Sequence, residues 1–114
     1  MNIEFDTYKQ KLNDCRPALD GLAESLNMDG MRSELERLHA MQEAPGFWDD
    51  PDKSNRQMKE LKNMKDTVEE YRKLETQYED ILTLIEMGYE ENDESLVAEI
   101  RAELDEFESE LDEL

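Results

Sequence analysis

A long helix is predicted over residues 51–88, PDKSNRQMKELKNMKDTVEEYRKLETQYEDILTLIEMG. Their apolar residues recur every three or four positions, the spacing that lines them along one face of an α-helix. The stripe consists of Met58, Leu61, Met64, Val68, Tyr71, Tyr78, Leu82 and Ile85, with Leu74 and Ile81 on its flank. Such a helix would be about 55 Å long at roughly 1.5 Å per residue. One short neighbour could not cover it, so several partner helices are expected.

The start of this helix is marked by residues 46–51, GFWDDP. Asp50 supplies a capping carboxylate, and Pro51 fits the first helical position, where a missing N–H costs nothing. Phe47 and Trp48 are predicted to fold back onto the first turns, as a hydrophobic staple does, and to plug the end of the bundle. The alternative is that they form an exposed binding anchor.

Two helices are predicted before the long one. The first has a stripe of Phe5, Tyr8, Leu12, Cys15, Leu19, Leu22 and Leu26. Pro17 lies on its solvent side, where we expect a bend without a break. After a stop at Asn27, with Asp29 as a cap, Met31, Leu35 and Leu38 would line a short second helix, ended by Ala44-Pro45-Gly46.

The last helix has the most regular pattern: Val97, Ile100, Leu104, Phe107, Leu111 and Leu114. Gly88 is the predicted C-terminal cap of the long helix, and Asp93 the N-cap of the last one. A turn near residue 90 would pair the two as a hairpin. We therefore predict an all-α fold, an elongated antiparallel three- to four-helix bundle, with residues 1–114 as one domain.

The formal net charge of −19 narrows the range of partners. A surface this acidic repels nucleic acid and anionic membranes, and favours basic proteins. Between residues 85 and 114, thirteen Asp or Glu face the single Arg101. A lone cysteine, no recognisable leader and no membrane-length apolar run predict a soluble cytoplasmic chain.

Three patterns resemble parts of metal-binding or catalytic sites, and each is better explained by a structural role. Glu36 and His39 have the Glu-x-x-His spacing of di-iron bundles, but the chain has no second His. The run after Asp50 opens like a calcium loop, yet Leu61 stands where that loop needs Glu. Cys15 lies in an apolar stripe and is predicted to be a buried thiol. The sequence thus predicts no catalytic, cofactor-binding or metal-ligating residue, and no enzyme.

The run from Leu35 to Tyr71, LERLHAMQEAPGFWDDPDKSNRQMKELKNMKDTVEEY, followed by an acidic hairpin, resembles the N-terminal helical domain of bacterial class I peptide chain release factors of type 2. Only residues 44–51 are specific to this family, because the rest of the run is a heptad pattern that many helical proteins share. Many family members have a Leu-Asp pair where this chain has Leu26 and Asn27, so Asn27 departs from the family pattern. The family's Gly-Gly-Gln loop and Ser-Pro-Phe codon reader have no counterpart here, so the resemblance implies a fragment and transfers no catalytic residue.

The resemblance implies a monomeric domain without activity of its own, which helps to position a UGA/UAA-type factor on the ribosome. Its implied partners are the GTPase-associated centre, the stalk-base proteins and the recycling GTPase. Two alternatives remain open. The first is a free-standing acidic coiled-coil adaptor that binds a basic partner and oligomerises through its stripes. The second is an acidic mimic of nucleic acid, whose partner would be released by moderate salt.

Overall fold

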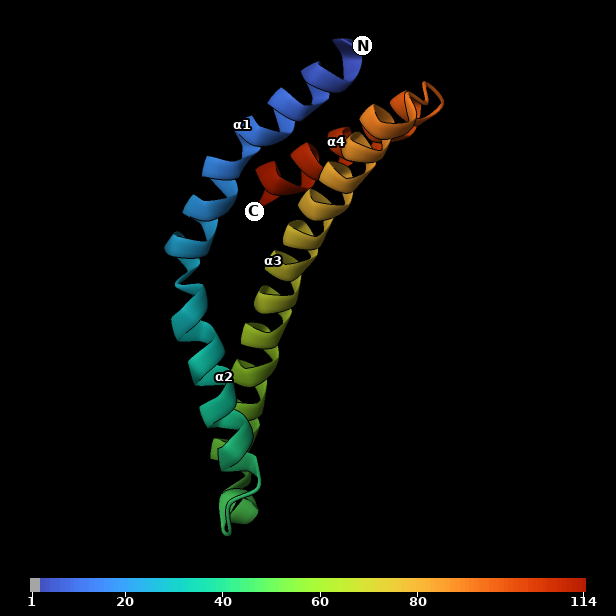
Figure 1. Ribbon diagram of the computed structural model, residues 1–114. Helices are drawn as coiled ribbons and strands as arrows, with labels where there is room; N and C mark the ends of the chain where they lie inside the picture. The colour runs from blue at the N-terminus through green and yellow to red at the C-terminus, as the bar shows by residue number, and fades with distance from the viewer. Residues whose placement is uncertain (1–2) are drawn as a thin grey trace. The chain divides into compact units, whose positions relative to one another are not determined.

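The computed structural model describes residues 3–114, which form four α-helices, one short 3₁₀ turn and no strand (Figure 1). The helices are α1 (Ile3–Leu26), α2 (Met28–Gln42), α3 (Pro51–Glu91) and α4 (Leu96–Glu113), and the 3₁₀ turn η1 is Phe47–Asp49. The all-α prediction is confirmed. The described residues divide into two compact units: one joins the segment up to Leu22 with Arg72–Leu114, and the other is Ala23–Tyr71.

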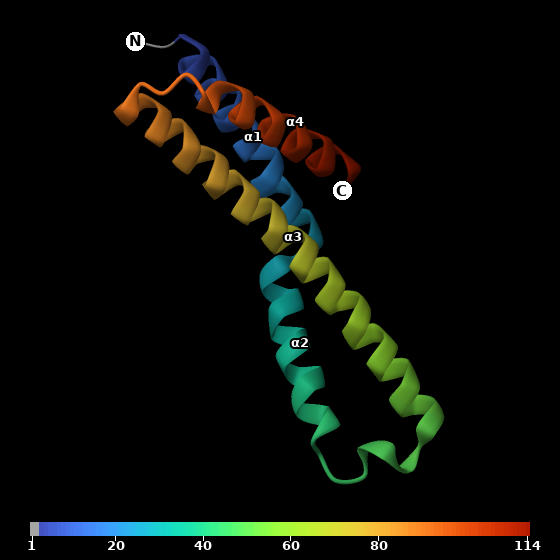
Figure 2. The same ribbon diagram turned by 90° about the vertical axis from the view of Figure 1, so that its right-hand side faces the viewer.

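The first unit packs three helical segments together. Figures 1 and 2 show α4 returning beside the last part of α3, with the first part of α1 alongside, so the predicted hairpin is confirmed. Its core consists of Phe5, Tyr8, Leu12, Leu19, Leu74, Ile81, Ile85, Ile100, Leu104 and Phe107. The Tyr78 and Phe107 rings meet edge to face at 6.2 Å between centroids. Arg101 Nε donates to Tyr8 Oη at 2.8 Å, which ties α4 to α1.

The inward face of α3 differs from the predicted one. Leu74 and Ile81, assigned to the flank, are almost fully buried, whereas Tyr78 and Leu82 of the assigned stripe are half-buried. Two helices cover this part of α3, and the most buried positions face between them. A stripe predicted for a single seam therefore places the centre of the buried face too far to one side.

The predicted cap at Gly88 is wrong, because α3 continues to Glu91. Gly88 is buried against Phe5: a Cβ placed there would lie 2.5 Å from Phe5 Cζ. Glycine is therefore needed for close helix packing and not for a turn. The left-handed residue that follows the helix is Asn92, with φ 49°.

Close to that contact, Tyr89 joins α3 to α1. Its ring lies edge to face with Phe5 at 5.7 Å, and its hydroxyl donates to the carboxylate of Asp6. The hydrogen bond to Asp6, followed by burial, raises the pKa of Tyr89 to about 12. Phe5 is thus held by both an aromatic neighbour and a glycine.

The second unit pairs α2 with the first part of α3 as an antiparallel hairpin (Figure 2). Its buried apolar residues are Met28, Leu38, Leu61 and Tyr71. The helix α2 begins earlier than predicted: Asn27, at φ 52°, makes the break, and Asp29 lies inside the first turn instead of capping it. Asparagine is one of the few residue types that adopt this left-handed conformation readily, which explains its place at the break.

The other predicted helix features have mixed outcomes. The helix α1 passes through Pro17 without a break, as predicted. The helix α4 begins at Leu96, with Ser95 as the residue before it, so Asp93 lies outside the cap position assigned to it. Its carboxylate instead accepts hydrogen bonds from the Ser95 N–H at 2.9 Å and the Ser95 hydroxyl at 2.6 Å. These bonds lower the pKa of Asp93.

Candidate interaction surface

The start of α3 has the cap that the sequence predicted. The Asp50 carboxylate accepts a hydrogen bond from the Lys53 N–H at 3.2 Å, and Pro51 is the first helical residue. The Ser54 N–H donates to the Asp50 carbonyl at 3.0 Å and closes the first helical turn. A carboxylate at this end also interacts favourably with the positive end of the helix dipole.

The loop before α3 is fixed by backbone hydrogen bonds. The Phe47 N–H donates to the Ala44 carbonyl at 3.3 Å, and the Asp49 N–H donates to the Gly46 carbonyl at 3.2 Å. Gly46 has φ 84°, which favours glycine, so its place at this turn follows from backbone geometry. Three consecutive residues, Phe47–Asp49, then form the 3₁₀ turn η1.

Ser54 anchors this loop from within α3. It is the one polar residue in the described chain that is fully buried, and its hydroxyl lies against the carbonyl oxygens of both Phe47 and Asp50. Burial of a hydroxyl is tolerated only with such partners. The sequence reasoning missed Ser54, and its position four residues after the Asp50 cap was the available signal.

Trp48 is exposed, which contradicts the prediction that both aromatics plug the bundle. Its exposed fraction is 58%, while Phe47 is half-buried. The two rings are perpendicular, with centroids 4.8 Å apart. Phe47 turns back over an open hollow of about 410 Å³ together with Met41 and Pro45, whereas Trp48 does not line it. Of the two aromatics, only Phe47 borders this hollow, which residues of α2 and the first turns of α3 also line.

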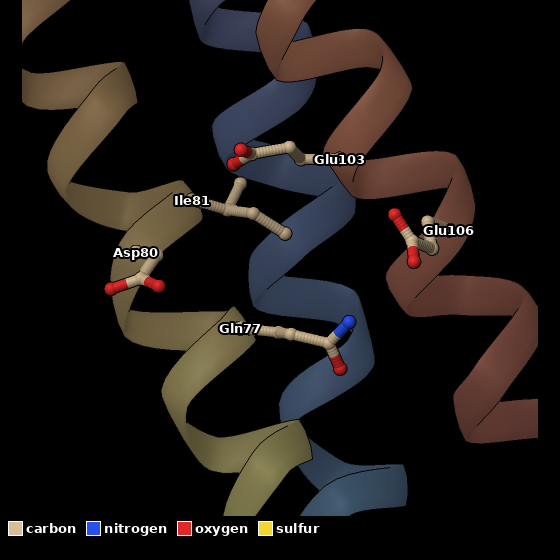
Figure 3. A pocket seen from close by; sticks show the side chains of 5 residues that line it. All are labelled: Gln77, Asp80, Ile81, Glu103 and Glu106. Atoms are coloured by element: carbon tan, nitrogen blue, oxygen red, sulfur yellow. The ribbon is translucent and has the colours of Figure 1, made fainter.

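A second surface is an acidic hollow of about 110 Å³ on the first unit. Figure 3 shows Gln77 and Ile81 of α3 reaching toward α4, and Glu103 of α4 reaching toward α3; Asp80 and Glu106 also line the hollow. Burial, and then repulsion by Glu99, Asp80 and Glu106, raises the pKa of Glu103. The Gln77 Oε1 atom is buried there without a hydrogen-bond partner.

The remaining candidate residues are a Glu–His pair three positions apart in the sequence. Glu36 and His39 are both exposed on α2, and His39 borders a shallow hollow with Lys62 and Lys65 of α3. Within residues 3–114, no group of three or more His, Cys, Asp or Glu side chains is arranged to hold a metal ion. No helix in that range has both the length and the apolarity of a membrane span.

Cys15 is partly buried, so the prediction of a buried thiol holds only in part. Burial raises the pKa of this thiol, and the carboxylates of Glu108, Asp112 and Asp14 raise it further. A thiolate is therefore disfavoured at this position. The arrangement is the opposite of the electropositive surroundings that activate a nucleophilic cysteine.

Comparison with known proteins places the chain in a family. Residues 31–114 match the family described as PCRF domain, and the chain belongs to that family. The chain is also similar to proteins named peptide chain release factor 2. It is 33% identical to the one from Haemophilus influenzae over 112 residues, which cover 98% of this chain and 31% of the relative.

Two other relatives carry the same name. The protein from Clostridium perfringens is 29% identical over 114 residues, covering 100% of this chain and 31% of its own length. The protein from Petrotoga mobilis is 29% identical over 100 residues, covering 88% of this chain and 26% of its own length. The chain therefore spans between a quarter and a third of each of these relatives.

Proposed function

We propose that this chain is the N-terminal helical domain, residues 1–114, of a peptide chain release factor that acts in translation termination. The observation that carries the proposal is the PCRF family match over residues 31–114, extended by relatives named peptide chain release factor 2 that align with nearly the whole chain. On this proposal the chain acts in the cytoplasm as part of a factor that reads UGA and UAA.

The proposed role of the domain is positional. What supports this role is that the described residues include an exposed aromatic and an acidic hollow, features that a protein partner can contact. We place its contacts at the GTPase-associated centre and stalk-base proteins of the ribosome, with the recycling GTPase as a further partner. The charge of −19 supports contact with basic proteins and disfavours direct binding to RNA.

A chimera tests the proposal. This chain replaces the matching segment of the Haemophilus influenzae release factor, and peptide release is measured on ribosomes programmed with UGA, UAA or UAG. A positional domain keeps release on UGA and UAA. Deletion of the segment should raise KM for the factor with little change in kcat, the signature of lost binding without lost chemistry.

Two controls make the result decisive. The isolated chain should give no release, and it should compete with the intact factor for ribosomes as a monomer. Inactivity of the chimera at saturating concentration would contradict the proposal. A concentration-dependent dimer that ignores ribosomes would instead favour the acidic coiled-coil adaptor.

A further inference from the structure

We propose that Trp48, together with Asp49 and Asp52, forms a docking site for an arginine in a basic protein segment. The inference goes beyond the release-factor role, because it depends on the geometry and charge of residues 44–54 and not on the family match. Trp48 is the chain's one tryptophan, and it is 58% exposed. Tryptophan is among the residues that most often dominate the energy of a protein interface.

The backbone under Trp48 is fixed on both sides. The Phe47 carbonyl is held by the buried Ser54 hydroxyl, and the Asp49 N–H is held by the Gly46 carbonyl at 3.2 Å. The Phe47 ring stands perpendicular to the indole at 4.8 Å. The indole is thus presented from an ordered loop, and a partner loses less binding energy to ordering than it would at a flexible one.

The charge around this tryptophan selects a cationic partner. Between residues 43 and 53 the chain carries Glu43, Asp49, Asp50 and Asp52 against Lys53, a net charge of −3. Asp50 is engaged with the Lys53 N–H as the helix cap. Asp49 and Asp52 are exposed and flank that cap in the sequence.

Arginine fits this chemistry better than lysine. Its planar guanidinium stacks on an indole face, where cation–π attraction is strongest, and at the same time it can donate two parallel hydrogen bonds to a carboxylate. Lysine offers a compact and strongly hydrated charge, and it lacks the planar fork that stacks on a ring and pairs with both oxygens of a carboxylate. A second copy of this chain also has a net charge of −19, so charge repulsion disfavours it as the occupant of this site.

The hollow beside the loop defines what should lie next to the arginine. It has a volume of about 410 Å³; Met41, Ala44, Pro45 and Phe47 form its apolar side, and Asp49, Asp50, Lys53 and Gln57 its polar side. An aliphatic side chain of the same segment would fill it. The occupant is therefore a basic protein segment in which an arginine lies near an aliphatic side chain.

The test uses Trp48 as its own reporter. The probe is a blocked peptide built from Arg, Leu and Ala without aromatic residues, titrated into the 114-residue chain while tryptophan emission is recorded. We expect a saturable blue shift, because the stacked indole leaves water. A peptide with Lys in place of Arg should bind more weakly, and one with Glu should not bind.

Matched variants separate the loop from general attraction to an acidic protein. Asp49→Asn with Asp52→Asn should weaken binding about tenfold, which corresponds to ~1.4 kcal/mol. Glu69→Gln with Glu70→Gln removes two exposed charges of α3 instead and should leave the affinity within about twofold. Trp48→Ala, followed by calorimetry after circular dichroism has verified folding, should lose about tenfold as well.

Equal weakening by both charge pairs, or binding that leaves the emission unchanged, would overturn the proposal. So would a blue shift that grows with protein concentration alone, since it would make a second copy the occupant. Failure here leaves the release-factor proposal standing, because the chimera tests that proposal without reference to Trp48.

Discussion

The two units bury their apolar side chains to different depths. In the three-helix unit, Phe5, Leu12, Leu19, Ile85, Ile100 and Phe107 are all 0% exposed. In the helix pair of the second unit, the most buried apolar residue is Leu38, at 3%. Two helices meet along one seam whose sides face water, whereas a third helix closes the seam.

Edge-to-face aromatic pairs occur in both units, and one pair from each unit shows opposite environments. Phe5 and Tyr89 are joined across two helices, with Phe5 fully buried. Phe47 and Trp48 are neighbours in one loop, and Trp48 is exposed. Edge-to-face ring packing thus stabilises the core at Phe5 and Tyr89, whereas at Phe47 and Trp48 it leaves one ring exposed to solvent.

The largest expected effect is at Phe5. Phe5→Ala removes a fully buried ring and should lower the free energy of unfolding by about 3–5 kcal/mol, because the cavity cannot be filled. Urea denaturation monitored by circular dichroism measures the change. Trp48→Ala is the matched control and should change stability by less than about 0.5 kcal/mol. Similar losses from the two variants would refute the contrast between the pairs.

Two glycines within helices should respond with opposite sign. Gly88→Ala places a Cβ against the Phe5 ring and should cost about 1–3 kcal/mol through overpacking. Gly21→Ala meets nothing within 4 Å and should stabilise α1 by about 0.5–1 kcal/mol, since alanine is the better helix former. Thermal melts of both variants decide this, and a gain at position 88 would show that Phe5 packs elsewhere.

A smaller effect is expected at the cap of α3. Asp50→Ala removes the acceptor of the Lys53 N–H and should cost about 1 kcal/mol, with faster amide exchange concentrated in residues 51–56. Asp50→Asn keeps an acceptor oxygen and should recover most of the loss. Exchange that rises equally in α4 would contradict a local cap.

The smallest effect is electrostatic and depends on pH. The folded-state pKa of Glu103 is raised by burial and then by neighbouring carboxylates, so the stability it contributes is present in acid and lost as pH rises through that raised pKa. Glu103→Gln should therefore stabilise the chain by a few tenths of a kcal/mol at about pH 7, and much less at about pH 4. Urea midpoints of both proteins at the two pH values measure this, and the same difference at both would contradict it.

The helical class, the start of α3 and the C-terminal hairpin were predictable because each depends on local chemistry. Asp50 followed by Pro51 specifies a helix start, and an apolar period specifies a face. Gly88 was misassigned because glycine has two uses, and the one that applies here depends on Phe5, far away in sequence. Leu74 and Ile81 were displaced from the stripe for the same reason, since the number of covering helices is a tertiary property.

Trp48 shows where local reasoning about the candidate site ends. The pattern GFWDDP predicts that both aromatics fold back, whereas only Phe47 is half-buried and lines the hollow beside the loop. Which of two adjacent aromatics turns inward depends on η1 and on the Ser54 anchor, and neither is encoded in the apolar period. For Trp48, the exposed position of the alternative interpretation agrees with its exposed fraction of 58%, and binding by it is the proposal made above.

The most direct test of a presented Trp48 is acrylamide quenching of its fluorescence in the native chain and in urea. Because the chain has a single tryptophan, emission excited selectively from tryptophan, and not from the four tyrosines, reports on this loop. An exposed Trp48 should give a native emission maximum close to that of the unfolded chain. Its native quenching constant should be only moderately below the unfolded value. A blue-shifted and quencher-resistant native emission that turns red on unfolding would show that Trp48 is a core residue, and would contradict the account.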